Sequence, residues 1–264
     1  MLTNDCQNLK VELNETGILT IILARPKALN ALNAQLLDEL SQVLDEAKNQ
    51  AAVKALLITG EGEKAFCVGA DIHRLADLDA TQGLTFATQG QQLFRALEQL
   101  GKPSLAAING YCFGGGCELA MAASMRIAHE KAVFGQPEVK LGVIPCYGGT
   151  QRLARLVGKG RAIDLCITGR SINASEALSW GLVTEVTSVE DLLPRAYAIL
   201  EKILEMAPLA VRNVLEVIDS GYDCNLDEAQ RLEALLFAMN CDTKDKDHGV
   251  QAFLNKQSPA FIGA

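Results

Sequence analysis

The sequence has few of the features that mark a metalloprotein or a disulfide-stabilised protein. It contains only three histidines, and none of its eight cysteines forms a C-x-x-C pair. Structural zinc sites depend on closely spaced Cys and His ligands, so we expect no metal site. Several cysteines lie inside apolar runs, which indicates reduced, buried thiols in a reducing compartment.

Positive charge is also in short supply. The chain carries 24 Lys and Arg residues against 32 Asp and Glu residues, for a net charge of -8. Nucleic-acid binding depends on clustered basic side chains that neutralise phosphates. This balance therefore argues against a nucleic-acid partner.

Signals for export and for membrane insertion are missing. Residues 1–5 show neither a basic and then apolar stretch nor the arginines of a transit peptide. The longest weakly polar stretch, residues 105–125, contains three consecutive glycines and Glu118, so we expect no membrane span. The expected location is the cytoplasm.

What the chain does contain is enough apolar sequence for a large core. Hydrophobic residues make up 49% of the chain, which argues against disorder. Apolar runs at residues 18–23, 53–59 and 104–108 predict strands, and each leads through a turn into a helical pattern. This recurrence predicts a layered repeat of ββα-like units over residues 1–190. Helical patterns then continue over residues 191–264, which we interpret as a second region.

The chemistry is expected where the third of these strands ends. It leads into glycines at positions 114–116, behind which we expect a helix over residues 117–125. Backbone N–H groups at a helix start approach a ligand oxygen closely when side chains are absent. Glu118 falls in the first turn, where the helix dipole favours a carboxylate. The glycines alone are equally typical of close helix–strand packing.

Five ordered motifs, spread over nearly the whole chain, carry a family resemblance. They are RPKALNAL at 25–32, AFCVGADI at 65–72, NGYCFGGGCELA at 109–120, FGQPE at 134–138 and GGTQRL at 148–153. Together they resemble the enoyl-CoA hydratase (crotonase) family, and the hydratases most closely. The resemblance implies an α/β fold: a crotonase-like ββα spiral core with a helical C-terminal trimerisation region. It also implies homotrimers, or hexamers built as paired trimers.

The resemblance further implies the catalytic groups. The N–H groups of Ala70 and Gly115 would form an oxyanion hole for a thioester carbonyl, and Glu118 and Glu138 would be the catalytic carboxyls. Adding water to a C2=C3 bond needs one group that takes a proton from water and one that directs protonation of C2. We assign Glu118 to water activation and Glu138 to proton delivery. Relatives with other activities usually lack one of the pair.

Contacts with an acyl-CoA substrate follow from the same resemblance. Lys27 would lie near the adenine or phosphates of coenzyme A, and Asp71 would be structural more than reactive. Phe237 and Lys256 match positions that reach coenzyme A in part from a neighbouring subunit. The full expected set is Lys27, Ala70, Asp71, Ile72, His73, Gly115, Cys146, Phe237 and Lys256.

Two of these positions depart from the family pattern. His73 stands where many hydratases have lysine. Cys146 stands where the loop usually has glycine after Ile-Pro, and its side chain adds bulk and a thiol near the catalytic water. We expect this change to affect the choice of acyl group. A nucleophilic role for the thiol is not expected, because no histidine base lies nearby in the sequence.

The sequence therefore predicts an enoyl-CoA hydratase that converts trans-2-enoyl-CoA to 3-hydroxyacyl-CoA, as in fatty acid β-oxidation. No metal or redox cofactor is expected, because coenzyme A arrives as part of the substrate. Two alternatives stay open. One is another reaction on the same fold, such as isomerisation of an enoyl-CoA. The other is a non-catalytic, RNA-binding relative, against which the acidic charge balance argues.

Overall fold

The computed structural model describes residues 6–72 and 75–264. The strands are β1 (Leu9–Leu13), β2 (Ile18–Leu23), β3 (Ala55–Gly60), β4 (Ala65–Cys67), β5 (Ser104–Ile108), β6 (Tyr111–Phe113), β7 (Met125–His129), β8 (Val133–Gly135), β9 (Ser171–Asn173) and β10 (Glu185–Thr187). The α-helices are α1 (Ala34–Asn49), α2 (Ala80–Glu98), α3 (Gly115–Ala122), α4 (Gly149–Val157), α5 (Lys159–Thr168), α6 (Ala174–Trp180), α7 (Leu192–Leu204), α8 (Pro208–Gly221), α9 (Leu226–Cys241) and α10 (Lys244–Leu254). Short 3₁₀ helices are η1 (Pro26–Ala28) and η3 (Glu138–Leu141).

The strands alternate between two sheets along the chain. One sheet has the order β1-β2-β3-β5-β7-β10, and the other has the order β4-β6-β8-β9. Each of β3, β5 and β7 is followed by a strand of the second sheet and then by an α-helix. Successive units pair in parallel within both sheets. The predicted ββα repeat is therefore confirmed.

Local signals in the sequence set several helix starts. Asn33 caps α1 through a 2.8 Å bond from Leu36 N–H, and Asp79 opens α2 with a capping box. α3 begins at Gly115, two residues before the expected start, because Gly114 turns the backbone directly into the helix at a φ of 50°. Such a positive φ strains any residue with a side chain. The first helical N–H therefore belongs to a glycine.

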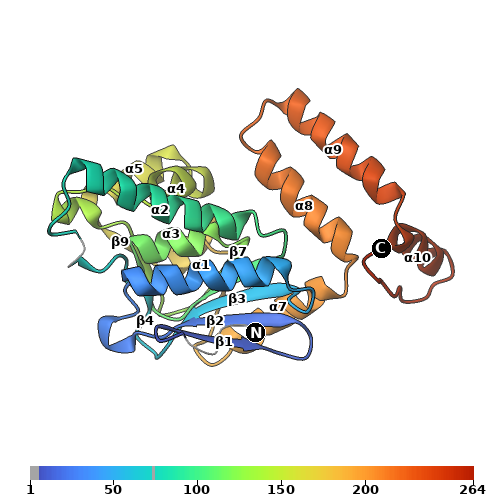
Figure 1. Ribbon diagram of the computed structural model, residues 1–264, viewed down its shortest axis with the longest axis horizontal. Helices are drawn as coiled ribbons and strands as arrows, with labels where there is room; N and C mark the ends of the chain where they lie inside the picture. Colours follow the sequence, from blue (N-terminus) through green and yellow to red (C-terminus); the bar gives the residue numbers. More distant parts are fainter. Residues whose placement is uncertain (1–5, 73–74) are drawn as a thin grey trace.

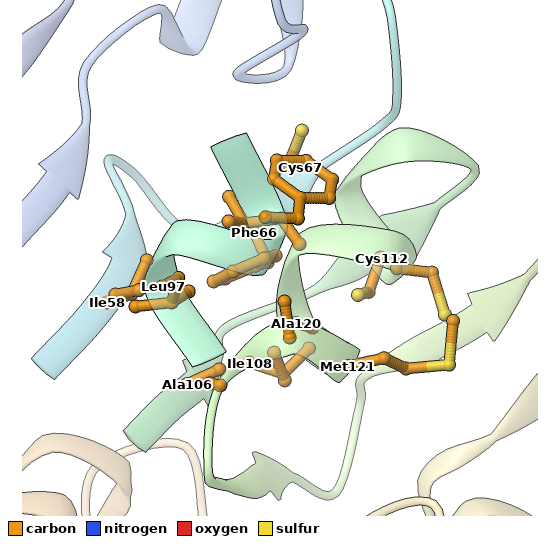
Figure 2. Packing of buried hydrophobic residues seen from close by; sticks show 14 of the residues in the cluster. Ile58, Phe66, Cys67, Leu97, Ala106, Ile108, Cys112, Ala120 and Met121 are labelled. Carbon is orange, nitrogen blue, oxygen red and sulfur yellow. The ribbon is translucent and has the colours of Figure 1, made fainter. Parts of the chain in front are cut away.

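Apolar side chains pack on both faces of the larger sheet. Because neighbouring side chains of a strand point to opposite faces, Leu56 and Ile58 of β3 join one apolar cluster while Leu57 joins another. The first cluster also contains side chains of α1, α2 and α3. Figure 2 shows members of it from β3, β5, β6, α2 and α3 gathered around Phe66. Burial of this cluster fixes α3, which carries the glycine turn and Glu118, against the strands.

The second cluster ties α7 to the sheet. Leu192, Ala196 and Leu200 of this helix pack with Leu57 and with other residues of the same face. The apolar packing of the sheet therefore continues past residue 190. The division of the chain into regions at that residue stays a prediction.

Helices α8, α9 and α10 extend away from the two sheets (Figure 1). Large apolar side chains on them face solvent in this single chain, among them Ile218 at 61% exposure, Phe237 at 69% and Phe253 at 84%. Exposed apolar surface on this scale is typical of an interaction surface. Within the described ranges, none of the helices combines the length and apolar character that crossing a membrane requires.

The cysteines divide into buried, half-buried and exposed groups, of which Cys6, Cys146 and Cys166 are half-buried. Cys67, Cys112 and Cys117 are free and buried near the glycine turn, as the sequence predicts for thiols inside apolar runs. Cys241 at the end of α9 and Cys224 between α8 and α9 are free and exposed, so the expectation of buried thiols does not extend to them.

Candidate active site

Two glycine turns bring the backbone N–H groups of Ala70 and Gly115 to one place. A Cβ added to Gly69 would lie 3.3 Å from Gly115 N, and one added to Gly115 would lie 3.3 Å from Ala70 N. Ala70 forms a parallel bridge with Leu32, in which Leu32 N–H donates to Gly69 O and Asp71 N–H donates to Leu32 O. Because successive N–H groups of an extended chain point in opposite directions, the Ala70 N–H points away from Leu32.

The N–H of Gly115 is available for a different reason. Gly115 is the first residue of α3, and the first N–H groups of a helix have no acceptor within it. The flanking groups are engaged, since Gly114 N–H donates to Gly135 O and Glu118 N–H donates to Gly114 O. Two such donors suit one oxygen that carries negative charge.

Glu118 lies in the first turn of α3, the helix that begins at Gly115, and is only 1% exposed. Its Oε1 accepts hydrogen bonds from Tyr147 N–H at 2.8 Å and from Gly149 N–H at 2.6 Å. Burial is the largest influence on this group and raises its pKa to about 7. The bond from Gly149 opposes that rise, and the charge of Glu138 adds to it.

Glu138 reaches the same region from η3. A Cβ added to Gly114 would lie 2.8 Å from Glu138 Oε1, so this carboxylate touches the glycine turn in front of α3. With its amide turned to satisfy its neighbours, the buried Gln136 donates to the two oxygens of Glu138 at 2.9 and 3.1 Å. Burial raises the pKa of Glu138 to about 7. Both carboxyls are therefore able to hold or release a proton near neutral pH.

Cys146 adds a thiol to this group. It is half-buried in the loop before α4, and its pKa is raised to about 12 by burial and then by the charges of Glu118 and Glu138. The thiol therefore lies in the field of both carboxylates and stays protonated at neutral pH. Within the described ranges, no three His, Cys, Asp or Glu side chains gather as metal ligands.

The other sequence-predicted residues lie at the edge of this region or away from it. Asp71 pairs with Arg25 at 3.3 Å, which agrees with a structural use of its charge. Lys27 on η1 and Ile72 are exposed. Phe237 and Lys256 lie in the projecting C-terminal region (Figure 1), and this chain does not bring them beside the two glutamates. His73 lies outside the described residues.

Other residues at the site lie inside the motifs or, for Tyr147, directly before one, but had no role assigned from the sequence. They are Gln136, which faces Glu138, Tyr147 and Gly149, whose N–H groups hold Glu118, and Arg152, which donates to Tyr147 O. The direction of a backbone N–H in a loop depends on tertiary packing, so the letters of the motif do not reveal it. The buried position of Gln136 had a weak signal in its place between Gly135 and Pro137.

Comparisons with known proteins place the whole chain. Residues 14–264 match the family model of enoyl-CoA hydratase/isomerase. The chain belongs to this family. The resemblance seen in the five motifs is thereby confirmed.

Relatives with recorded names share more than two fifths of their residues with the chain. A short-chain-enoyl-CoA hydratase of Clostridium acetobutylicum is 43% identical, over 92% of this chain and 93% of that protein. A crotonyl-CoA hydratase of Syntrophomonas wolfei is 44% identical, over 94% of this chain and 95% of that protein. Among solved structures, an enoyl-CoA hydratase from Bacillus anthracis has a TM-score of 0.93 and 40% identity, covering 98% of this chain and 100% of that one. The predicted crotonase-like fold is confirmed.

Proposed function

We propose that this protein is an enoyl-CoA hydratase that adds water across the C2=C3 bond of trans-2-enoyl-CoA to give 3-hydroxyacyl-CoA. One observation carries the proposal: the backbone N–H groups of Ala70 and Gly115 lie close together, beside the buried Glu118 and the half-buried Glu138, whose pKa values are each raised to about 7. The names of the relatives from Clostridium and Syntrophomonas support short acyl chains as the substrates.

In the proposed reaction, the N–H groups of Ala70 and Gly115 act as an oxyanion hole. They donate to the thioester carbonyl oxygen, which draws electron density from C3 and stabilises the enolate that forms when water attacks. The loss of one such donor typically costs on the order of 10²–10³ in rate. Both donors are fixed by the backbone, so little reorganisation is needed as the charge develops.

The two glutamates divide the proton transfers. Glu118 is anchored through Oε1, which leaves Oε2 to orient a water and to take its proton as the oxygen bonds to C3. Glu138 in its acid form delivers a proton to C2. The cycle closes when the proton gained by Glu118 passes to Glu138, which costs little because the two pKa values are both about 7.

Coenzyme A enters as part of the substrate, and the proposed chemistry uses no metal or redox cofactor. The exposed Lys27 offers a cation to its phosphates, and the family motifs make Asp71, Ile72 and Cys146 further candidate contacts of the acyl-CoA. The position of His73 in the family motif makes it a further candidate contact.

The remaining part of the proposal concerns assembly and location. We place Phe237 and Lys256 at the coenzyme A site of a neighbouring subunit, in a homotrimer or a hexamer of paired trimers. The exposed apolar surface of α8, α9 and α10 supports such an assembly. The cytoplasm is the proposed location.

Incubation with crotonyl-CoA tests the function. We expect the absorbance of the conjugated thioester to fall as water adds, and Glu118→Gln and Glu138→Gln to lose most of the activity while still binding acyl-CoA. Glu39→Gln is a matched control, because Glu39 is also buried and accepts the N–H groups of Gln7 and Asn8. An unchanged absorbance with the wild type would refute hydration of short chains, and isomerisation of a 3-enoyl-CoA without hydration would favour the alternative reaction.

A further inference from the structure

The loop that holds Glu118 is itself held by one side chain. Arg152 of α4 donates from Nη1 to Tyr147 O at 2.8 Å, and its own N–H donates to Gly148 O at 2.9 Å. Tyr147 and Gly149 are the two residues whose N–H groups bind Glu118 Oε1. The guanidinium thus fixes the same short segment that fixes the carboxylate.

The packing at Gly148 shows how closely the guanidinium follows this segment. A Cβ added to Gly148 would lie 2.1 Å from Arg152 Nη1, and the residue has a φ of 105°. Neither the space nor the backbone conformation admits a side chain there. Arg152 therefore lies directly against the peptide between the two donors of Glu118, where a shift of the guanidinium moves both of them.

Arg152 is in turn held by α2. Its Nε donates to Glu98 Oε1 at 2.6 Å and its Nη2 to Glu98 Oε2 at 2.8 Å, a bidentate pair in which the side chains are only 16% and 18% exposed. Bidentate pairing of this kind fixes the orientation of the guanidinium as well as its distance from the carboxylate. Arg95 extends the network by contacting Glu98 at 3.3 Å and Asp219 of α8 at 2.8 Å.

The charge of Arg152 acts on Glu118 as well. It lowers the pKa of Glu118 against the larger rise caused by burial. The other groups that face Glu118 are Glu138 on η3, Cys146 in the adjoining loop and Cys166 on α5. The pKa values of these two thiols are raised to about 12 and about 11, so they remain neutral over the pH range in which Glu118 titrates.

We propose that Arg152 is a positioning residue for Glu118, aligning the backbone donors of this carboxylate and supplying the cation that favours its ionised form, with Glu98 holding the guanidinium in place. The inference rests on the proposed function, because it assigns Arg152 a task in activating the water that adds to the substrate. Arg152 acts through Glu118 and the loop and makes no contact with the reacting atoms.

The test is the pH dependence of crotonyl-CoA hydration, measured as kcat and KM from about pH 5.5 to about pH 9, a range that brackets the titration of the glutamates. For Arg152→Met we expect kcat to fall about 10- to 100-fold, since a displacement of about 1 Å costs on the order of 10² in rate. KM should stay within about threefold, because the residue acts on the chemical step. The acidic limb of kcat/KM should move to higher pH by about half a unit or more, because the lost cation no longer favours ionised Glu118.

Two further variants separate alignment from charge. Arg152→Lys keeps the cation but lacks the fork that reaches both Tyr147 O and Glu98, so kcat should fall while the acidic limb stays in place. Glu98→Gln removes a negative charge beside Arg152, so the limb should move to lower pH. These variants also keep the test available if Arg152→Met does not fold.

Arg155→Met is the matched control. Arg155 lies one turn along α4 and pairs with Asp223 at 3.0 Å. The pH profile of Arg155→Met should match that of the wild type. A wild-type kcat or an unmoved acidic limb in Arg152→Met would overturn the inference while leaving hydration by the wild type intact. Absence of hydration in the wild type would instead refute the proposed function.

A measurement that does not depend on catalysis tests the inference even if the wild type shows no hydration. Above about pH 7, we expect Glu118→Gln to raise the urea concentration at the unfolding midpoint more in the Arg152→Met background than in the wild-type background. Without the charge of Arg152 nearby, the Glu118 carboxylate is costlier to ionise. An equal rise in both backgrounds would contradict an electrostatic link between Arg152 and Glu118.

Discussion

Glu118→Gln should make the folded protein more stable at neutral and alkaline pH. Burial raises the pKa of Glu118 from its ordinary value of 4.5 to about 7. A folded-state pKa above the unfolded value gives stability that is fully present below pH 4.5 and is lost as the pH rises through about 7. The full cost of ionising this group in the folded protein is on the order of 3 kcal/mol. Glutamine has nearly the same shape, can accept from the N–H groups of Tyr147 and Gly149, and never ionises.

The assay is urea unfolding of both proteins at one protein concentration and at a series of pH values. We expect the two free energies of unfolding to be similar near pH 4.5, and Glu118→Gln to gain between about 1 and about 3 kcal/mol by about pH 8. Glu39→Gln is the control with the opposite sign. Glu39 accepts Gln7 N–H through Oε1 and Asn8 N–H through Oε2, and glutamine has only one acceptor oxygen for these two donors, whereas both backbone donors of Glu118 share Oε1. A Glu118→Gln protein no more stable than the wild type at pH 8 would refute the claim that this site keeps a carboxylate at a cost to folding.

Three other substitutions test the packing around the site. Gly149→Ala should lower kcat roughly 10²-fold, because the added Cβ would lie 2.8 Å from Glu118 Oε1. Gly160→Ala is the control and should leave the kinetics unchanged, because its added Cβ would have no atom within 4 Å. Gly90→Ala should lose about 1–3 kcal/mol of unfolding free energy, since its Cβ would lie 2.1 Å from a buried tyrosine ring, while Gly83→Ala in the same helix should gain up to about 1 kcal/mol. Arg126→Met should cost about 2–4 kcal/mol, because the buried guanidinium donates to three backbone carbonyls that would lose their partner. Kinetics with crotonyl-CoA and urea unfolding check these outcomes, and a Gly90→Ala protein as stable as Gly83→Ala would contradict the packing argument.

Much of the fold could be predicted because its signals are local. Strand β5 was placed at its observed bounds from an unbroken apolar run, and helical patterns were expected after the strands that precede α1 and α2. Short elements were missed because they carry too little of this local signal. β6 has only three residues, and α4 has nine and begins at Gly149 directly after Gly148, so neither offers enough apolar periodicity to be recognised.

The candidate site was also only partly predictable from the sequence. Glu118 and Glu138 could be named from motifs, and the glycine turns that carry Ala70 and Gly115 were visible as letters in the sequence. The partners of Glu118 were not, because its hydrogen bonds join residues 29 and 31 positions apart in the chain. The raised pKa values depend on burial in the folded chain, which the sequence of the motif does not contain.

The central claim concerns one oxygen atom: the thioester carbonyl is held by two backbone donors while one water lies between two carboxyls. A crystal structure with the saturated analogue butyryl-CoA tests it most directly. We predict a carbonyl oxygen about 2.7–3.1 Å from both Ala70 N and Gly115 N, with C3 facing the gap between Glu118 and Glu138. A thioester bound with its oxygen turned away from these two nitrogens would contradict the account.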